Sequence, residues 1–84
     1  MKHTDAIKKI MIDTNVSQVD LMKQIGLKSR SAISSRINQD NISVKAMLEI
    51  LDAMGYELVV RKSFGTYELN EYPIRLQDYE RREK

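Results

Sequence analysis

Several residue types are scarce in this 84-residue sequence, which has no cysteine, one proline, one histidine and three glycines. Without cysteine, the chain can form no disulfide, no thiolate zinc site and no thiol nucleophile. The single histidine, His3, stands near the terminus without a partner motif, and we interpret it as solvated. The sequence offers no nucleophile with a paired base, no metal-ligand cluster and no glycine-rich phosphate loop. We therefore expect no catalysis, no cofactor and no metal.

Long apolar runs are missing as well. No run approaches the length that crosses a membrane, and the N-terminus lacks the apolar segment of a secretion signal. Hydrophobic residues make up 42% and charged residues 31%, which is the balance of a folded globular chain. We therefore expect one small cytoplasmic domain without a membrane partner, whose core is modest enough for a second chain to complete it.

Positive charge is concentrated in the first half of the sequence. Residues 1–38 carry seven Lys and Arg against three Asp, a formal charge of +4. Residues 39–84 carry seven Lys and Arg against nine Asp and Glu, a formal charge of −2. This asymmetry favours a nucleic-acid partner for the first half, and such binding would place the protein at the nucleoid.

Hydrophobic periodicity predicts four helices, over residues 4–14, 17–25, 29–38 and 43–55. Each has a side chain that can cap its first turn: Thr4, Ser17, Ser29 and Ser43. Asp20 lies three residues after Ser17 and completes a capping box. Two of the helices are expected to stop at glycines, Gly26 and Gly55.

The apolar positions of these helices define the expected core. From the first three helices they are Ile7, Ile10, Met11, Leu21, Met22, Ile25, Ile33 and Ile37. In the fourth helix the core-facing residues are Val44, Met47, Leu48, Leu51 and Met54, with Ile50 and Ala53 beside them. Because the fourth helix is the most apolar, we expect it at the centre of the domain.

The sequence after Gly55 changes from helical to strand-like periodicity. Residues 56–61 are rich in β-branched and aromatic types and predict a strand, and residues 66–69 predict a second strand that completes a hairpin. Pro73 is expected to interrupt this pattern, and residues 74–76 to add a short third strand. The chain thus divides into a helical domain, residues 1–55, a hairpin, residues 56–76, and a charged flexible tail, residues 77–84.

The second and third predicted helices are joined by a short turn after Gly26, and the third is polar over most of its surface. Two helices so joined can present the second one outward, and the major groove of B-form DNA admits one α-helix. The stretch Gln18-Val-Asp-Leu-Met-Lys-Gln-Ile-Gly26-Leu27, followed by Ser29-Arg30-Ser31-Ala32-Ile33-Ser34, resembles the Xre/Cro/lambda-repressor helix-turn-helix family. The resemblance covers about residues 4–58 and is similar in particular to short phage or mobile-element regulators.

The resemblance implies a mainly α fold class, a four-helix lambda-repressor-like helix-turn-helix domain, which here precedes a C-terminal β-hairpin. The sequence departs from the family in three places. Met22 stands where a small residue is usual, the stretch from Gly26 to Ile33 is one residue longer, and strand-like sequence replaces the fifth helix.

The resemblance also implies the DNA-binding residues. Those expected at backbone phosphates are Gln18, Lys28 and Ser29. Those expected at base edges are Arg30, Ser31, Ser34 and Ser35. Asn38 would touch phosphate or base, and the lengthened turn would direct Arg36 either to the DNA backbone or to solvent.

The function implied is that of a sequence-specific transcriptional regulator, expected to be a repressor that binds a palindromic operator as a homodimer. One small module buries little surface, and two-fold pairing doubles the readout. Residues 56–61 are the candidate element for pairing across the dimer, because a lone hairpin leaves its edges open. Two alternatives stay open: an antitoxin that holds a toxin through residues 56–84, and a protein-interaction module that does not bind DNA.

Overall fold

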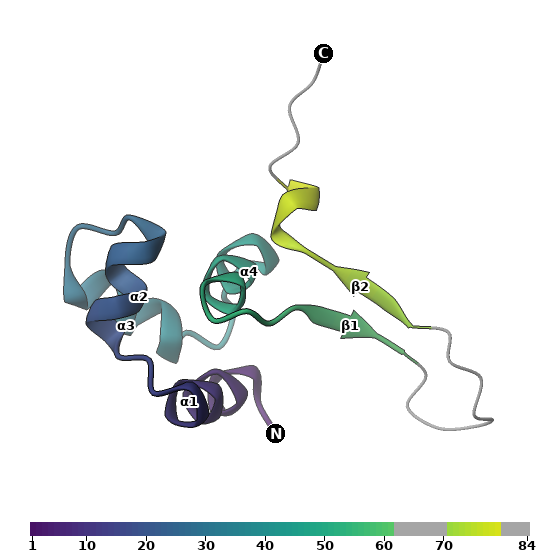
Figure 1. Cartoon of the computed structure of the whole chain (residues 1–84), viewed down its shortest axis with the longest axis horizontal. Helices are drawn as coiled ribbons and strands as arrows, with labels where there is room; N and C mark the ends of the chain where they lie inside the picture. Colours follow the sequence, from purple (N-terminus) through teal and green to yellow (C-terminus); the bar gives the residue numbers. More distant parts are fainter. Residues whose placement is uncertain (62–70, 80–84) are drawn as a thin grey trace, which may run out of the picture.

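The computed structural model describes residues 1–61 and 71–79. Within these residues the helices are α1 (His3–Thr14), α2 (Gln18–Ile25), α3 (Arg30–Asn38) and α4 (Val44–Ala53). They are followed by a two-stranded antiparallel sheet of β1 (Leu58–Val60) and β2 (Tyr72–Ile74), and by the 3-10 turn η1 (Leu76–Tyr79). Figure 1 shows the helices gathered on one side and the sheet extending from α4 on the other. The prediction of a mainly helical chain with a small C-terminal sheet is confirmed.

Serine side chains cap three of the four helices, as predicted. The Asp20 amide donates to Ser17 Oγ over 3.1 Å, and the Asp20 carboxylate accepts from the Ser17 amide over 3.0 Å, which completes the capping box. Ser29 Oγ accepts from the Ala32 amide over 3.2 Å, and Ser43 Oγ accepts from the Ala46 amide over 3.1 Å. Each bond satisfies an amide that the helix itself leaves without a partner.

Left-handed glycines follow α2 and α4. Gly26 has a φ of +91° and Gly55 a φ of +83°, the region that glycine enters without steric cost. After α4, the Tyr56 amide donates to the Leu51 carbonyl over 2.9 Å and the Gly55 amide to the Asp52 carbonyl over 3.0 Å. These two bonds form a Schellman motif, in which the chain turns out of the helix and enters β1.

The start of α1 differs from the prediction. Thr4 does not cap the helix: α1 begins at His3, its N-cap is Lys2, and Lys2 makes no side-chain capping bond. Thr4 is instead buried inside the first turn, at 7% exposure. His3 is half-buried rather than solvated, and its Nε2 lies 3.0 Å from the Gln39 carbonyl oxygen. The first turn of α1 therefore lacks a side-chain cap and contacts Gln39, the residue that follows α3.

The core collects apolar side chains from every helix. Its buried cluster consists of Ile7, Leu21, Ile33, Ile37, Ile50 and Leu51, and Leu48 of α4 is buried outside this cluster. Met22 and Val16 pack against this cluster. Two predictions for α4 need correction, because Ile50 is fully buried whereas Val44 is 41% exposed. The inner face of α4 is thus rotated toward Ile50.

The sheet pairs β1 with a different segment from the one predicted. Its register sets Leu58 opposite Ile74, Val59 opposite Pro73 and Val60 opposite Tyr72. Pro73 therefore lies within a strand instead of interrupting the pattern, which a strand at a sheet edge tolerates because one of its sides needs no N–H donor. The predicted strand over residues 66–69 lies outside the described residues.

The segment after β2 also differs from its prediction. The tail was expected to begin at residue 77, but Leu76–Tyr79 form η1, which lies against α4. The Asp78 carboxylate accepts from the Arg75 amide over 3.0 Å and so caps this turn. The remainder of the predicted tail, residues 80–84, lies outside the described residues.

The capping box gives the fold a testable pH dependence. The hydrogen bonds from the Ser17 amide and hydroxyl, and more weakly the charge of Lys23, lower the pKa of Asp20. An Asp whose pKa is lower in the folded than in the unfolded chain stabilises the fold at pH values above the unfolded pKa, which is about 3.9. This stabilisation is lost as the pH falls through the pKa of the folded state. We expect Asp20→Asn to lower the free energy of unfolding at pH 7, and the difference from the parent chain to shrink below about pH 4.

Urea unfolding at a series of pH values from 7 to 2.5 measures this difference. The matched control is Asp13→Asn, because Asp13 is an exposed acid on α1 that makes no hydrogen bond with the described residues. A difference between the parent chain and Asp20→Asn that stays constant over the whole pH series would contradict the role of the Asp20 carboxylate.

Candidate nucleic-acid interface

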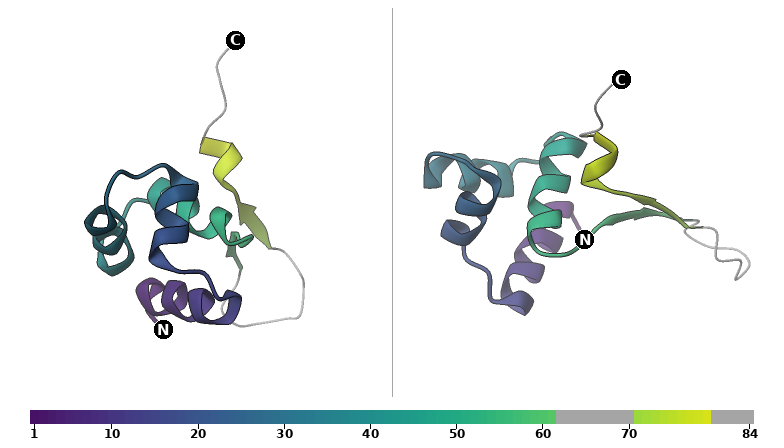
Figure 2. Two further views of the ribbon diagram at one scale, coloured as in Figure 1. Left: turned by 60° about the vertical axis from the view of Figure 1, so that its left-hand side comes forward. Right: turned by 45° about the horizontal axis from the view of Figure 1, so that its top comes forward.

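The helix α3 buries Ile33 and Ile37, and most of its other residues are polar. Successive residues of an α-helix are rotated by about 100°, so that positions 31, 35 and 38 lie opposite these two isoleucines. Ser31, Ser35 and Asn38 are all exposed, as this rotation requires. In Figures 1 and 2, α3 lies at the side of the helical part that faces away from the sheet. The helix therefore presents an open polar face at the surface.

The side chains of this face are small, and several are held close to the helix. Ser29 Oγ and Ser31 Oγ lie 3.1 Å apart, and Asn38 Nδ2 donates to the Ser34 carbonyl over 2.8 Å. Ser34 is half-buried at the flank of the face, while Arg30 extends from the first turn and is exposed. Serine hydroxyls both donate and accept, so the face can meet either kind of hydrogen-bonding group.

Two cations stand at the entrance to α3. Lys28 lies in the connection over residues 26–29, Arg30 is the first residue of α3, and both are exposed. Neither has an acidic group within 4.0 Å in the part of the chain that the structure describes. Their charge is therefore not neutralised locally and is available to an anionic partner.

Gln18 is held next to α3 by the start of α2. It is the first residue of α2, half-buried, and lines a shallow groove together with Lys8 of α1 and Ile37 of α3. The groove brings a cation, Lys8, beside the predicted residue Gln18. Lys8 was counted in the positive charge of residues 1–38 but was not predicted as a contact residue.

Four ion pairs show how charge is distributed over the described residues. The paired acids are Asp40, Glu49, Glu57 and Glu71, with Lys2, Arg36, Arg75 and Arg61 as their respective partners. The described cations without such a pair are Lys8, Lys9, Lys23, Lys28, Arg30 and Lys45. Most of this unpaired positive charge therefore lies on α1, α2 and the start of α3.

Arg36 does not belong to the open face of α3. Its Nη1 donates to Glu49 Oε1 of α4 over 2.6 Å, and the two side chains are only 30% and 25% exposed. The prediction that Arg36 points to the DNA backbone or to solvent is therefore wrong. The pair connects α3 to α4 in a half-buried setting, where a charge without a partner is costly.

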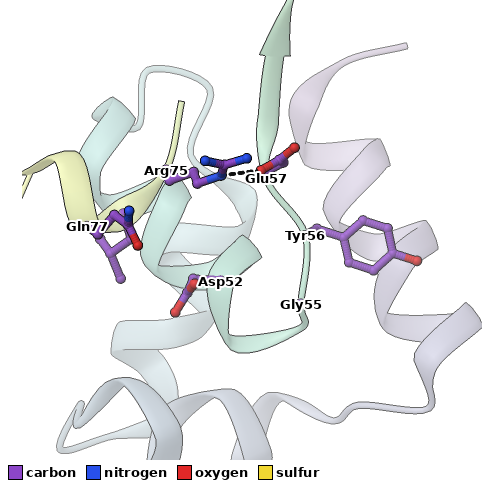
Figure 3. Close-up of a pocket in the computed structure, with 7 residues that line it drawn as sticks. Asp52, Gly55, Tyr56, Glu57, Arg75 and Gln77 are labelled. Atoms are coloured by element: carbon purple, nitrogen blue, oxygen red, sulfur yellow. Dashed lines mark hydrogen bonds and ion pairs between the residues drawn. The ribbon is translucent and has the colours of Figure 1, made fainter. Parts of the chain in front are cut away.

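A separate pocket lies at the end of α4, as Figure 3 shows. It has a volume of about 620 Å³ and is lined by Asp52, Gly55, Tyr56, Glu57, Arg75, Leu76 and Gln77. Arg75 Nε donates to Glu57 Oε1 over 2.7 Å in its wall, and this bond raises the pKa of Arg75. Sequence reasoning missed the pocket because its residues come from segments that are far apart in the chain.

The described residues contain no group of three or more His, Asp or Glu side chains that could hold a metal ion. None of their helices combines the length and the apolar character that crossing a membrane requires. Comparisons of the chain with family models, with curated proteins and with solved structures found no match.

The ion pair between Arg36 and Glu49 makes a stability prediction. We expect Arg36→Ala and Glu49→Ala each to lower the free energy of unfolding by about 1–3 kcal/mol, because each leaves a half-buried charge without its partner. The double variant should lose clearly less than the sum of the two single losses. Denaturant unfolding of the four chains measures the coupling.

Arg30→Ala is the matched control, because Arg30 lies on the same helix but is exposed and unpaired among the described residues. Its effect on the free energy of unfolding should stay within about 0.5 kcal/mol. Strictly additive losses for the Arg36 and Glu49 substitutions would show that the pair contributes no coupling.

Proposed function

We propose that this chain binds double-stranded DNA by placing α3 in the major groove, and that it acts as a sequence-specific transcriptional regulator. The observation that supports this most is the open polar face of α3, which small serines line and unpaired cations flank. α3 gives Ile33 and Ile37 to the core and exposes Ser31, Ser35 and Asn38 on the opposite side. Its exposed surface fits a function in which the helix enters a groove.

The small side chains of α3 suit close approach to base edges. Ser31, Ser34 and Ser35 leave room for the helix backbone to come near the floor of the groove, and their hydroxyls can bond to either type of base group. Arg30 has the length and the paired donors for a bidentate contact with guanine. These four residues are our candidates for direct readout.

The residues around α3 suit contacts with phosphates. Lys28 and the Ser29 cap stand at the amino end of α3, and Gln18 stands at the amino end of α2, where the helix dipole favours an anion. Such contacts position a protein on the duplex and carry no sequence information by themselves. Lys8 joins this group because it lines the same groove as Gln18.

We further propose that the protein works as a homodimer on a palindromic operator, as a repressor that covers its site. Two copies related by a two-fold axis would present their α3 helices to half-sites about 34 Å apart. Two reading helices also supply the contact area that a single small module lacks. Two alternative functions, an antitoxin and a protein-interaction module, differ from this proposal in their partner.

Selection of bound sites from random duplexes is the experiment that tests the proposal as a whole. It should return a palindromic site with half-sites separated by one helical turn, bound with an affinity that falls steeply as salt rises. No enrichment of any sequence, together with no salt-dependent binding of duplex DNA, would overturn the proposal and favour a protein partner.

Two alanine variants separate base reading from phosphate contact. Arg30→Ala should cost roughly 1–3 kcal/mol on the selected site and relax the preference at one base pair. Lys28→Ala should weaken binding to all sequences alike and reduce the slope of log K against log salt by about one. Titrations of selected and random duplexes at several salt concentrations measure both effects.

Lys9→Ala is the control, since it removes the same charge from an exposed position on α1 that is not among the proposed contacts. Its effect should be smaller than that of either variant. An equal loss on selected and random DNA for Arg30→Ala would refute the proposed base contact of Arg30.

A further inference from the structure

The two-stranded sheet leaves three large apolar side chains exposed to solvent. Val59 is 42% exposed, Val60 is 53% exposed and Tyr72 is 64% exposed. Only the cross-strand pair nearest the helices, Leu58 and Ile74, is half-buried. Two strands of three residues are too little for independent stability, so this sheet needs further pairing or cover.

The two edges of the sheet are not equally open. The outer edge of β2 contains Pro73, which has no N–H to offer a further strand. β1 has no proline, no glycine and no charged residue. Within the described residues its other side pairs with no strand, because the sheet consists of β1 and β2 alone. A further strand would therefore add beside β1.

The sequence of β1 and its neighbours is complementary to itself when it runs antiparallel. It reads Glu57-Leu58-Val59-Val60-Arg61, with an acid at one end and a base at the other. A two-fold axis through Val59 would place Glu57 opposite the partner's Arg61, and Arg61 opposite the partner's Glu57. We infer that β1 pairs with β1 of a second copy of this chain in this register, which gives a four-stranded sheet.

The charges already present within one copy extend this complementarity. Glu57 accepts from Arg75 over 2.7 Å (Figure 3), and Arg61 lies 3.8 Å from Glu71. Both pairs lie across β1 and β2 in the observed register. In the dimer, each outer row of that face would read Arg75, Glu57, the partner's Arg61 and the partner's Glu71, so that every neighbour has the opposite sign.

Other symmetric registers lose this match. An axis through Glu57 or Arg61 would set like charges opposite one another, which is unfavourable across strands. An axis through Leu58 or Val60 would set Glu57 and Arg61 opposite uncharged residues. The register centred on Val59 is thus favoured by charge.

This inference deepens the homodimer of the proposed function by naming the surface, and it does not depend on DNA binding. The chain has no cysteine, so a single introduced one reports the register directly. In the proposed dimer the two copies of residue 59 are directly opposite, with Cα atoms about 4.5–5.5 Å apart, within reach of a disulfide. We expect Val59→Cys to give a covalent dimer under mild oxidation.

The control is Val60→Cys. Val60 is more exposed than Val59, but its two copies would be diagonal neighbours about 8 Å apart, beyond disulfide range. Non-reducing electrophoresis of both variants measures cross-linking. Equal cross-linking of the two variants, or none for Val59→Cys, would overturn the proposed register.

Paired charge swaps test the contact between copies while keeping the contacts within each copy. E57R/R75E preserves the pair within the chain but sets like charges across the dimer, and R61E/E71R does the same with the opposite sign. Each should raise the dimer dissociation constant by roughly tenfold, as sedimentation measures it. A mixture of the two variants should form heterodimers at parental affinity. The chain that carries all four changes should form homodimers at parental affinity.

The possible outcomes separate this inference from the proposed function. A chain that remains monomeric at every concentration overturns the β1 interface and leaves the sheet to a different protein, as the antitoxin alternative requires. Swaps without effect on dimerisation also overturn it. A dimer that meets these expectations but does not bind DNA supports the interface and overturns only the proposed function.

Discussion

Ile33 and Ile37 hold α3 on the domain, and the arrangement of the surface depends on them. They are fully buried against Leu21 of α2 and Ile50 of α4, while the half-buried pair of Arg36 and Glu49 fixes the side of α3 that faces α4. The opposite side of α3, with Ser31, Ser35 and Asn38, is thereby left for the outer surface. A wider apolar stripe would have drawn the serines into the core. The narrowness of the stripe is therefore what creates the open face.

The helical part of the fold could be predicted from the sequence because its signals are local. Ser17, Ser29 and Ser43 each lie within three residues of the amide that they cap, and Gly26 and Gly55 act through their own φ angles. The one wrong cap, Thr4, has a suitable side chain, but burial in the fold removes it from the helix end. The exposure of Val44 and the burial of Ile50 have the same origin, since the rotation of α4 depends on its neighbours.

The features that the sequence did not reveal are contacts between distant residues. Nothing local distinguishes residues 66–69 from Tyr72–Ile74 as the partner of β1, because pairing depends on where the chain returns to the sheet. Likewise, the role of Arg36 follows from Glu49, thirteen positions away in the sequence. The exposure of Ser31, Ser35 and Asn38 could nevertheless be foreseen, because exposure along a helix follows from the positions of its two buried isoleucines.

The separation between the inner and outer faces of α3 has a consequence for how this protein can evolve. The outer residues contribute little to the free energy of folding, so under the proposed function substitutions among them are limited by the DNA surface and not by the core. Under that function, descendants of such a chain could acquire new DNA targets by changing a few serines while keeping the same scaffold. The two buried isoleucines would then remain constant within a lineage whose specificity diverges.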